Sequence, residues 1–272
     1  MSDKISLAGD LGSGKSTVSR ILVEKLGLTY YSTGTVVRAM ASEHGMTVVE
    51  FNEYMEKHPE LDREIDDRLI ALSDDPRALI IDSRMAFHFV RDTFRVYFST
   101  ELETSAARIL GDHRAEESFA TLEETAANIK RRKASERKRY SDFYGVDCKD
   151  LSKYSLVIDT TYATPAEVSE ALTAEFDEWK KDHARCACLL SPLRLYYPED
   201  TSPEEAARRA EALDCKEQIA LPTVIEEDGC FYLTDHAESA MAYAISDRLF
   251  CPCKLKKGNK KDIDYVRMSN SL

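Results

Sequence analysis

The feature that most constrains this chain is the octapeptide GDLGSGKS at residues 9–16, which directly follows the apolar run KISLA at residues 4–8. It fits the pattern GxxxxGK[ST], in which glycines let successive backbone N–H groups turn inward around phosphate oxygens. A strand before the loop and a helix after it complete the arrangement, because a helix N-terminus favours bound anions. The alternative interpretation is a glycine-rich turn with a chance lysine, and the flanking strand and helix disfavour it.

This loop predicts a site for the triphosphate of ATP with Mg²⁺. Lys15 is expected to reach the β- and γ-phosphates, and the Ser16 hydroxyl is expected to ligate Mg²⁺. Asp82 ends the apolar run at 78–81 and is expected to hold a water of the Mg²⁺ shell, unless it caps a helix. The residues predicted to bind the cofactor in this loop are Gly9, Gly12, Ser13, Gly14, Lys15, Ser16 and Thr17.

Alternating strands and helices predict an α/β fold with a parallel sheet and helices on both faces. The helix from Lys15 is expected to end before Gly27, a residue suited to a C-cap. Strands are expected in the apolar runs at 4–8, 28–32, 78–81, 95–98 and 155–159. Further helices are expected through Arg38 to His44, after Thr47, at 101–111, at 121–143, and from Thr164 to about Lys181.

The pattern changes after Lys181, which predicts a second, small α+β domain. The expected domains are residues 1–182 and 183–272. Asp228-Gly229 lies between two apolar runs and is a strong hairpin signal. Around it we expect a strand at 193–197, helices from Ser202 and at 235–246, and a strand near 250–254. The polar tail from Lys256 is expected to fray.

The composition limits the classes of partner that the chain is expected to bind. The chain has 49 acidic and 37 basic residues, a net charge of −12, which argues against broad nucleic-acid binding. It has no membrane-length apolar stretch and no signal-peptide pattern, so we expect a cytoplasmic location. The cysteines are expected to be free thiols. Cys186, Cys188, Cys251 and Cys253 could offer four thiolates to zinc, or could be small buried residues.

A basic stretch, NIKRRKASERKRY at 128–140, stands out in this acidic chain. It is open to three interpretations: a solvated helix face, an RNA-binding patch, or an arginine-rich lid that closes over nucleotide. Beside a phosphate loop we favour the lid, because arginine neutralises the charge that spreads over a transferring phosphoryl group. The candidate arginines of the chain are Arg38, Arg84, Arg108, Arg131, Arg132, Arg137 and Arg139.

Together these segments resemble the cytidylate kinase family, most of all its archaeal branch, over about residues 3–180. The matching segments are GDLGSGKST, YSTGTVVR (31–38), HGMTVVEFNEY, HPELDREID (58–66), IIDSR and SERKRYSDFYGVD (135–147). The resemblance implies a nucleoside-monophosphate kinase, with a core sheet for ATP, a small insertion for the monophosphate, and an arginine lid. The implied reaction uses ATP and Mg²⁺ to convert CMP or dCMP to its diphosphate.

The motifs and the resemblance together suggest roles for individual residues. Lys15, Asp82, Arg132 and Arg139 would be catalytic, with the two arginines on the transferring phosphoryl group. Arg108 would join the residues that bind ATP, and Ser16 with Asp82 would hold the metal. The acceptor would be bound by Ser32, Arg38, Arg84 and Asp159, with Arg38 and Arg84 on its phosphate.

Several positions depart from the family. Ser83 stands where glycine is usual, Lys133 where an acid is common, and Met85 where an acid reads cytosine in the bacterial branch. The acceptor therefore stays open, and the alternatives are a kinase of another small metabolite or a non-catalytic nucleotide-binding regulatory protein.

The C-terminal part resembles the ParB-like fold shared with sulfiredoxins. Its turn at 234–238 lacks the arginine of that fold's phosphate-binding turn. A regulatory role is expected there, with contact to a protein partner or self-association. The other expected partner is a small-molecule nucleotide, and neither a membrane nor a nucleic acid is expected.

Overall fold

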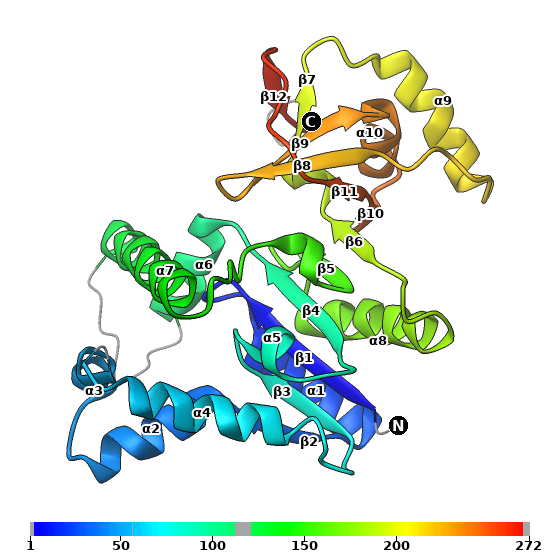
Figure 1. The fold of residues 1–272 in the computed structure, drawn as a ribbon. Helices are drawn as coiled ribbons and strands as arrows, with labels where there is room; N and C mark the ends of the chain where they lie inside the picture. Colours follow the sequence, from blue (N-terminus) through cyan, green and yellow to red (C-terminus); the bar gives the residue numbers. More distant parts are fainter. Residues whose placement is uncertain (1–2, 56, 112–120, 269–272) are drawn as a thin grey trace.

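The computed structural model describes residues 3–55, 57–111 and 121–268, which contain two β-sheets (Figure 1). The first has seven strands, all paired in parallel except for β10, which runs antiparallel to β6. In spatial order the strands are β10 (Cys251–Pro252), β6 (Ala187–Leu190), β5 (Leu156–Asp159), β4 (Phe94–Ser99), β1 (Lys4–Gly9), β3 (Leu79–Asp82) and β2 (Thr29–Ser32). The five expected parallel strands are confirmed.

Helices cover both faces of this sheet because successive strand residues point to opposite sides. Phe94, Val96 and Phe98 pack with α1 (Lys15–Leu26) and α8 (Pro165–Lys181), whereas Tyr97 belongs to the core of the other face. That other face is covered by α4 (Pro59–Ala71), α5 (Ala86–Phe89) and the 3₁₀ turn η1 (Leu151–Lys153).

Two local signals read from the sequence set helix ends as expected. Gly27 adopts a left-handed conformation with φ 65° at the C-cap of α1. Thr164 and Glu167 form a reciprocal capping box at the start of α8, and Pro165 takes the first helical position. The sequence therefore fixes where both helices of this face begin or end.

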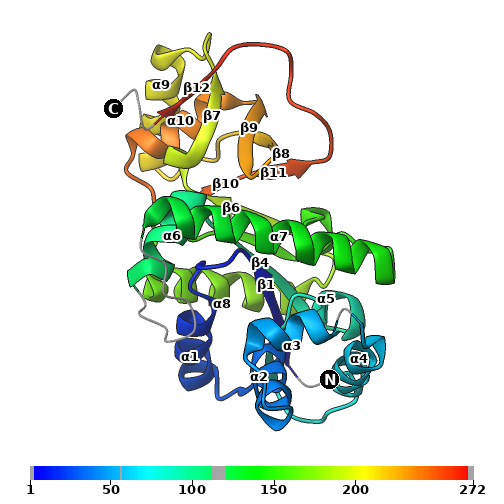
Figure 2. The ribbon, with the colours of Figure 1, turned by 90° about the vertical axis from the view of Figure 1, so that its left-hand side faces the viewer.

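Three helices between β2 and β3 form a small group with its own apolar cluster. They are α2 (Thr33–Glu43), α3 (Val48–Met55) and α4, packed around Met40, Phe51 and Ile65. The two remaining helices of the N-terminal part are α6 (Leu102–Gly111) and α7 (Leu122–Tyr144). Figure 2 shows α7 crossing the molecule between the α2–α4 group and the C-terminal part.

The second sheet lies in the C-terminal part, in the order β11 (Lys254–Lys256), β8 (Thr223–Glu227), β9 (Cys230–Asp235), β7 (Leu195–Pro198) and β12 (Tyr265–Arg267). Helices α9 (Pro203–Asp214) and α10 (Ala237–Ile245) complete this small α+β part, and the 3₁₀ turn η2 (Pro192–Arg194) leads into β7. The expected hairpin is present, with β8 and β9 antiparallel around Asp228-Gly229.

The structure corrects two expectations. The parallel sheet does not stop near Lys181, because β6 continues it beside β5. The tail from Lys256 does not simply fray, because β12 pairs with β7 and the Tyr265 ring contacts Tyr232 at a centroid distance of 5.1 Å. Residues 183–272 thus contribute strands to both sheets, and the two-domain division remains a proposal.

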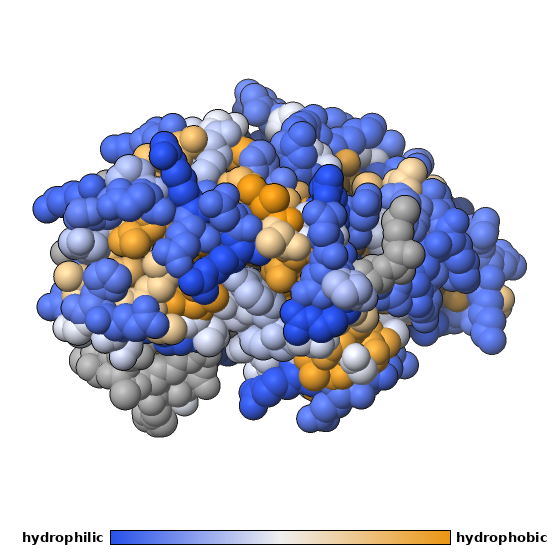
Figure 3. Space-filling model, turned by 60° about the horizontal axis from the view of Figure 1, so that its bottom comes forward, coloured by the Kyte–Doolittle hydropathy of each residue, from blue (hydrophilic) through white to orange (hydrophobic). Residues whose placement is uncertain are grey.

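The surface is mostly hydrophilic on the face shown in Figure 3, with hydrophobic residues in separate patches. Within the described ranges, no helix combines the length and the apolar character that crossing a bilayer requires.

Candidate functional site

The phosphate loop connects the end of β1 to the start of α1 and is packed too tightly for side chains at two positions. Gly9 has φ 145°, and a Cβ there would lie 2.4 Å from the Phe98 carbonyl oxygen. Gly12 has φ 68°, and its Cβ would lie 2.7 Å from the Ser105 carbonyl oxygen. Both glycines are therefore needed for the loop to sit against β4 and α6.

The concave side of the loop is open. Gly14 is the N-cap of α1 with φ 80°, no side chain among the described residues caps it, and a Cβ there would meet nothing within 4 Å. The first amides of α1 therefore face free space at the positive end of the helix dipole. Ser13, Ser16 and Thr17 flank this opening, so the loop has the form of an anion cradle.

Lys15 lies folded over the loop. Its Nζ donates to the carbonyl oxygens of Asp10 at 2.8 Å and Gly9 at 3.2 Å. Burial lowers the pKa of Lys15 to about 8, Arg84 acts in the same direction, and the negative charges of Asp82 and Asp10 oppose it. The ammonium is therefore held at the mouth of the cradle by carbonyl groups that a phosphate oxygen can replace.

Asp82 lies at the carboxyl end of β3, in register with Leu7 of β1 and Ser32 of β2. Its Oδ2 accepts a hydrogen bond of 2.9 Å from the Tyr30 hydroxyl. The N-cap of α5 is Met85, without a side-chain cap in the described structure, so Asp82 does not serve as the cap of that helix.

The donor set of Ser16 and Asp82 fits Mg²⁺. A hydroxyl and a carboxylate are hard oxygen donors, and Mg²⁺ is usually held by one or two carboxylates together with water and substrate phosphates. Across the described ranges, no three His, Cys, Asp or Glu residues are grouped so that they could hold a metal ion. For the C-terminal cysteines this favours the second interpretation: Cys188, Cys251 and Cys253 are buried free thiols, and Cys186 is exposed.

A groove of about 410 Å³ runs between α2 and α4. Ser32 and Thr35 line one side of it, and Glu64 and Arg68 line the other. Arg38 is exposed beside the groove and donates to the Thr35 hydroxyl at 3.1 Å. A Cβ at Gly34 would lie 3.5 Å from both Arg38 Nη1 and Ser32 Oγ, so these two side chains are neighbours beside the groove.

A second cavity, of about 230 Å³, lies between the phosphate loop and α7. Arg84 lines it and forms an ion pair with Glu136 of α7. Lys133, also on α7, places its Nζ 2.8 Å from Oδ1 of Asp10. In this structure the cations of the cavity are therefore neutralised by carboxylates of the chain itself.

The two predicted lid arginines both lie on α7. Arg132 directly precedes Lys133. Arg139 faces α4, where burial raises the pKa of Asp62 and the charge of Arg139 opposes that rise. The Nε of Arg139 is buried and has no hydrogen-bond partner among the described residues. An anion entering this side of α7 would therefore find a donor ready for it.

Arg108 and Asp159 lie away from the groove. Arg108 Nη2 donates to the carbonyl oxygens of Thr160 at 2.7 Å and Thr161 at 3.2 Å. Asp159 is 1% exposed, and its Oδ1 accepts from Arg194 at 2.9 Å. The expectation that Asp159 binds the acceptor is corrected by this placement, because its carboxylate is enclosed by the chain and does not line the groove.

Four residues of the site were missed by sequence reasoning: Asp10, Glu136, Lys133 as a partner of the loop, and Arg194. The departure at Lys133 was visible in the sequence, and the opposite charges of Asp10 and Lys133 were the available signal. Nothing in the sequence linked Arg194 to Asp159, since they stand 35 residues apart.

Comparisons with known proteins agree with this geometry. The AAA domain family matches residues 9–141. The cytidylate kinase of Halorubrum lacusprofundi is 37% identical over 177 residues, which cover 64% of this chain and 90% of that protein. A crystal structure of an uncharacterized protein from Eubacterium ventriosum covers 65% of this chain and 99% of its own, with a TM-score of 0.50 and 13% identity. That likeness concerns the fold alone.

One relative reaches further along the chain. The S-adenosylmethionine-dependent nucleotide dehydratase of Lacinutrix mariniflava is 33% identical over 239 residues, covering 81% of this chain and 48% of that protein. This share of the chain is larger than residues 1–182, so the similarity extends into the C-terminal part. About half of that relative has no counterpart here.

Proposed function

The chain belongs to the cytidylate kinase family, and from this premise we propose that it transfers the γ-phosphoryl group of ATP to a nucleoside monophosphate, with CMP or dCMP as the first-choice acceptor. The observation that carries the proposal is the open anion cradle at the start of α1, with Lys15 across its mouth and Arg84 in the adjoining cavity. A triphosphate and an acceptor phosphate both need positive charge at this junction.

In this proposal ATP, the phosphoryl donor, binds at the phosphate loop. The amides at the start of α1 bind the triphosphate, and Lys15 leaves the carbonyls of Gly9 and Asp10 to neutralise the β- and γ-phosphates. Bound Mg²⁺, held by Ser16 and Asp82, would supply further charge neutralisation. Because the transition state is loose, positioning and charge carry the catalysis, and no covalent enzyme intermediate is needed.

In this proposal the acceptor monophosphate binds in the groove between α2 and α4. Ser32 and Arg38 orient the monophosphate there, and its phosphate takes the place of Glu136 on Arg84. The acceptor oxygen then attacks the γ-phosphorus in line with the leaving oxygen. Arg132 and Arg139 on α7 stabilise the charge that spreads over the transferring group.

The identity of the acceptor base must be set by residues of the groove. Met85, at the position where the bacterial branch carries a cytosine-reading acid, is 4% exposed and part of an apolar core cluster. Ser83 is likewise buried. This burial favours a second candidate, a kinase of the same fold with another small phosphorylated acceptor.

An ADP-release assay with the full chain, ATP and Mg²⁺ tests the proposal across CMP, dCMP, UMP, AMP and a panel of small phosphorylated metabolites. Strong turnover with CMP or dCMP supports the leading function, and selective use of another acceptor supports the second candidate. ATP binding without turnover of any acceptor would replace both with a nucleotide-sensing role.

A further inference from the structure

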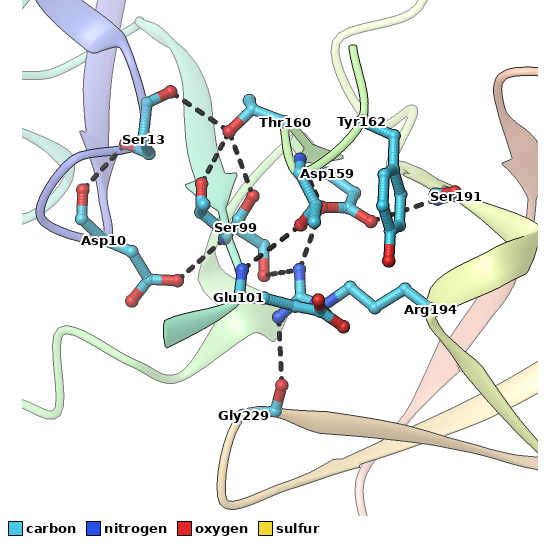
Figure 4. Close-up of polar contacts among 12 residues, drawn as sticks. Asp10, Ser13, Ser99, Glu101, Asp159, Thr160, Tyr162, Ser191, Arg194 and Gly229 are labelled. Atoms are coloured by element: carbon cyan, nitrogen blue, oxygen red, sulfur yellow. Dashed lines mark hydrogen bonds and ion pairs between the residues drawn. The ribbon is translucent and has the colours of Figure 1, made fainter. Parts of the chain in front are cut away.

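A buried arginine joins the C-terminal part to the core of the kinase. Arg194 is 2% exposed and lies at the end of η2, just before β7. Its Nη1 donates to Ser99 Oγ at 2.8 Å and to Asp159 Oδ1 at 2.9 Å, at the carboxyl ends of β4 and β5. Its Nη2 donates to the Gly229 carbonyl at 2.9 Å, in the hairpin of the second sheet (Figure 4).

Asp159 depends on this contact. Its Oδ1 also accepts from the Thr161 amide at 3.0 Å, and its Oδ2 accepts from the Ser191 amide at 3.2 Å. These groups carry no charge, whereas Arg194 forms an ion pair with Asp159. Removing Arg194 would leave the buried carboxylate at the end of β5 without its ion-pair partner.

That turn holds the phosphate loop. The hydroxyl of Thr160, the residue after Asp159, donates to the Ser13 carbonyl at 3.0 Å. It also lies 2.5 Å from the hydroxyl of Thr100, whose backbone amide donates to Asp10 Oδ2 at 3.0 Å. The chain of contacts thus runs from the hairpin through Arg194 and the end of β5 into both halves of the loop.

The same hairpin forms part of the cavity wall. Asp228, beside Gly229, lines the cavity that Arg84 and Lys133 line from the other elements. Glu226 of the hairpin has its Oε1 3.8 Å from Lys149 Nζ. A second contact joins the C-terminal part to the first sheet near Arg194: Arg267 of β12 forms an ion pair with Glu101, two residues after β4.

We propose that the C-terminal part is an integral component of the ATP site, and that Arg194 is a positioning residue that acts through Asp159 and Thr160 on the phosphate loop. The inference rests on the proposed kinase function and extends it, because it assigns residues 183–272 a role in nucleotide binding. A correctly seated turn after β5 fixes the Ser13 carbonyl, and this orients the cradle amides before ATP arrives.

The test uses the full chain with Arg194→Met, which keeps the apolar stem and removes the guanidinium. We expect the dissociation constant for ATP to rise about tenfold to a hundredfold, because the buried carboxylate left without its partner would shift the turn that holds the loop. The KM of the acceptor should change much less. Arg185→Met, which breaks the exposed pair with Glu175, is the matched control and should bind ATP like the wild type.

A double-mutant cycle separates positioning from simple destabilisation. Thr160→Val removes the contact to Ser13 and keeps the pair of Arg194 with Asp159. If both residues act on the loop through one chain of contacts, Arg194→Met should weaken ATP binding much less in the Thr160→Val background. The proposal would be overturned if the fold-changes of the two variants in the ATP dissociation constant simply multiply in the double variant. It would also be overturned if Arg194→Met lowers the melting temperature and leaves the ATP affinity unchanged.

If Arg194→Met does not fold, two milder variants carry the same test. Arg194→Lys keeps the charge and loses the fork that reaches Ser99, Asp159 and Gly229 together. Arg194→Met with Asp159→Asn removes both charges. Each should weaken ATP binding relative to Arg185→Met, and equal affinity would reject the role of Arg194. A wild-type chain that binds no ATP would instead reject the kinase function, and this inference with it.

Discussion

Lys133 of α7 forms an ion pair with Asp10 of the phosphate loop, with 2.8 Å between Nζ and Oδ1. Asp10 is 5% exposed, and burial alone would raise its pKa. The charges of Lys133 and Lys149 and the Thr100 amide outweigh burial and hold the pKa of Asp10 below its ordinary value. A carboxylate beside a triphosphate site is thus kept ionised and neutralised by the helix that carries the predicted lid arginines.

The first prediction concerns this pair. Lys133→Met should weaken ATP binding, because the uncompensated charge of Asp10 would repel the triphosphate. Asp10→Asn in the same chain should restore most of the affinity, since the repelling charge is then gone. Isothermal titration with ATP measures both variants. Equal losses in the single and double variants would show that Asp10 does not oppose the nucleotide.

As a further part of this first prediction, the same pair makes the stability of the fold depend on pH. Because the pKa of Asp10 is lowered in the folded state, its ionisation stabilises the fold above the ordinary value of 3.8. That contribution is lost as the pH falls through the lowered pKa. Chemical unfolding of wild type and Asp10→Asn should therefore differ most near neutral pH and converge in acid. A constant difference across this range would contradict the prediction.

The second concerns Lys15 and turnover. Lys15→Ala should lower kcat by roughly 10²–10⁴, the range for losing a preorganised group that stabilises developing charge. Lys25→Ala, an exposed lysine in the last turn of the same helix, is the control and should leave kcat unchanged. Near-normal turnover of Lys15→Ala in the ADP-release assay would mean that the reaction does not take place at this loop.

The third uses the lowered pKa of Lys15. Since that pKa lies at about 8, the ammonium of the free enzyme loses its proton as the pH rises through this value, and kcat/KM for ATP should fall. Stability should move the opposite way. Between about 8 and 10.5 the unfolded chain binds more protons at this lysine, so the free energy of unfolding rises with pH. Lys15→Met should lack this rise in a denaturant titration.

The fourth addresses the pair of Arg84 and Glu136. An acceptor phosphate must displace Glu136, so Glu136→Gln should lower the acceptor KM by weakening the internal competitor. Glu123→Gln, at the exposed start of α7, is the control. Steady-state kinetics at saturating ATP measures the effect. A raised acceptor KM in Glu136→Gln would mean that Glu136 orients Arg84 for the substrate.

Local signals made much of the core predictable. The phosphate loop has a fixed spacing, Gly27 ends α1 at its C-cap, and the capping box of α8 spans four residues. Such features depend on residues that are close in sequence, so they can be predicted from the sequence alone. The same holds for the apolar runs that became parallel strands.

The remaining features depend on partners far apart in the chain. The run ACLL of β6 is as short as a loop segment, and its pairing with β5 and β10 makes it a strand. In the sequence, Asp159 stands where a substrate-binding residue is expected. In the fold, its carboxylate is bound by Arg194. Met85 follows Arg84, which we propose to bind the acceptor phosphate, yet the Met85 side chain packs in an apolar core cluster. Pairings of this kind depend on tertiary geometry, which composition and spacing do not contain.

One apolar cluster runs from Ile81 of β3 through Val157 of β5 to Phe231 of β9 and Ala240 of α10. Heating should therefore melt both sheets in a single calorimetric transition, because this one cluster contains side chains from both of them. A protease cut near Lys181 should leave no folded fragment to isolate. The change of pattern near Lys181 therefore does not mark the limit of the apolar interior, to which both sheets contribute side chains.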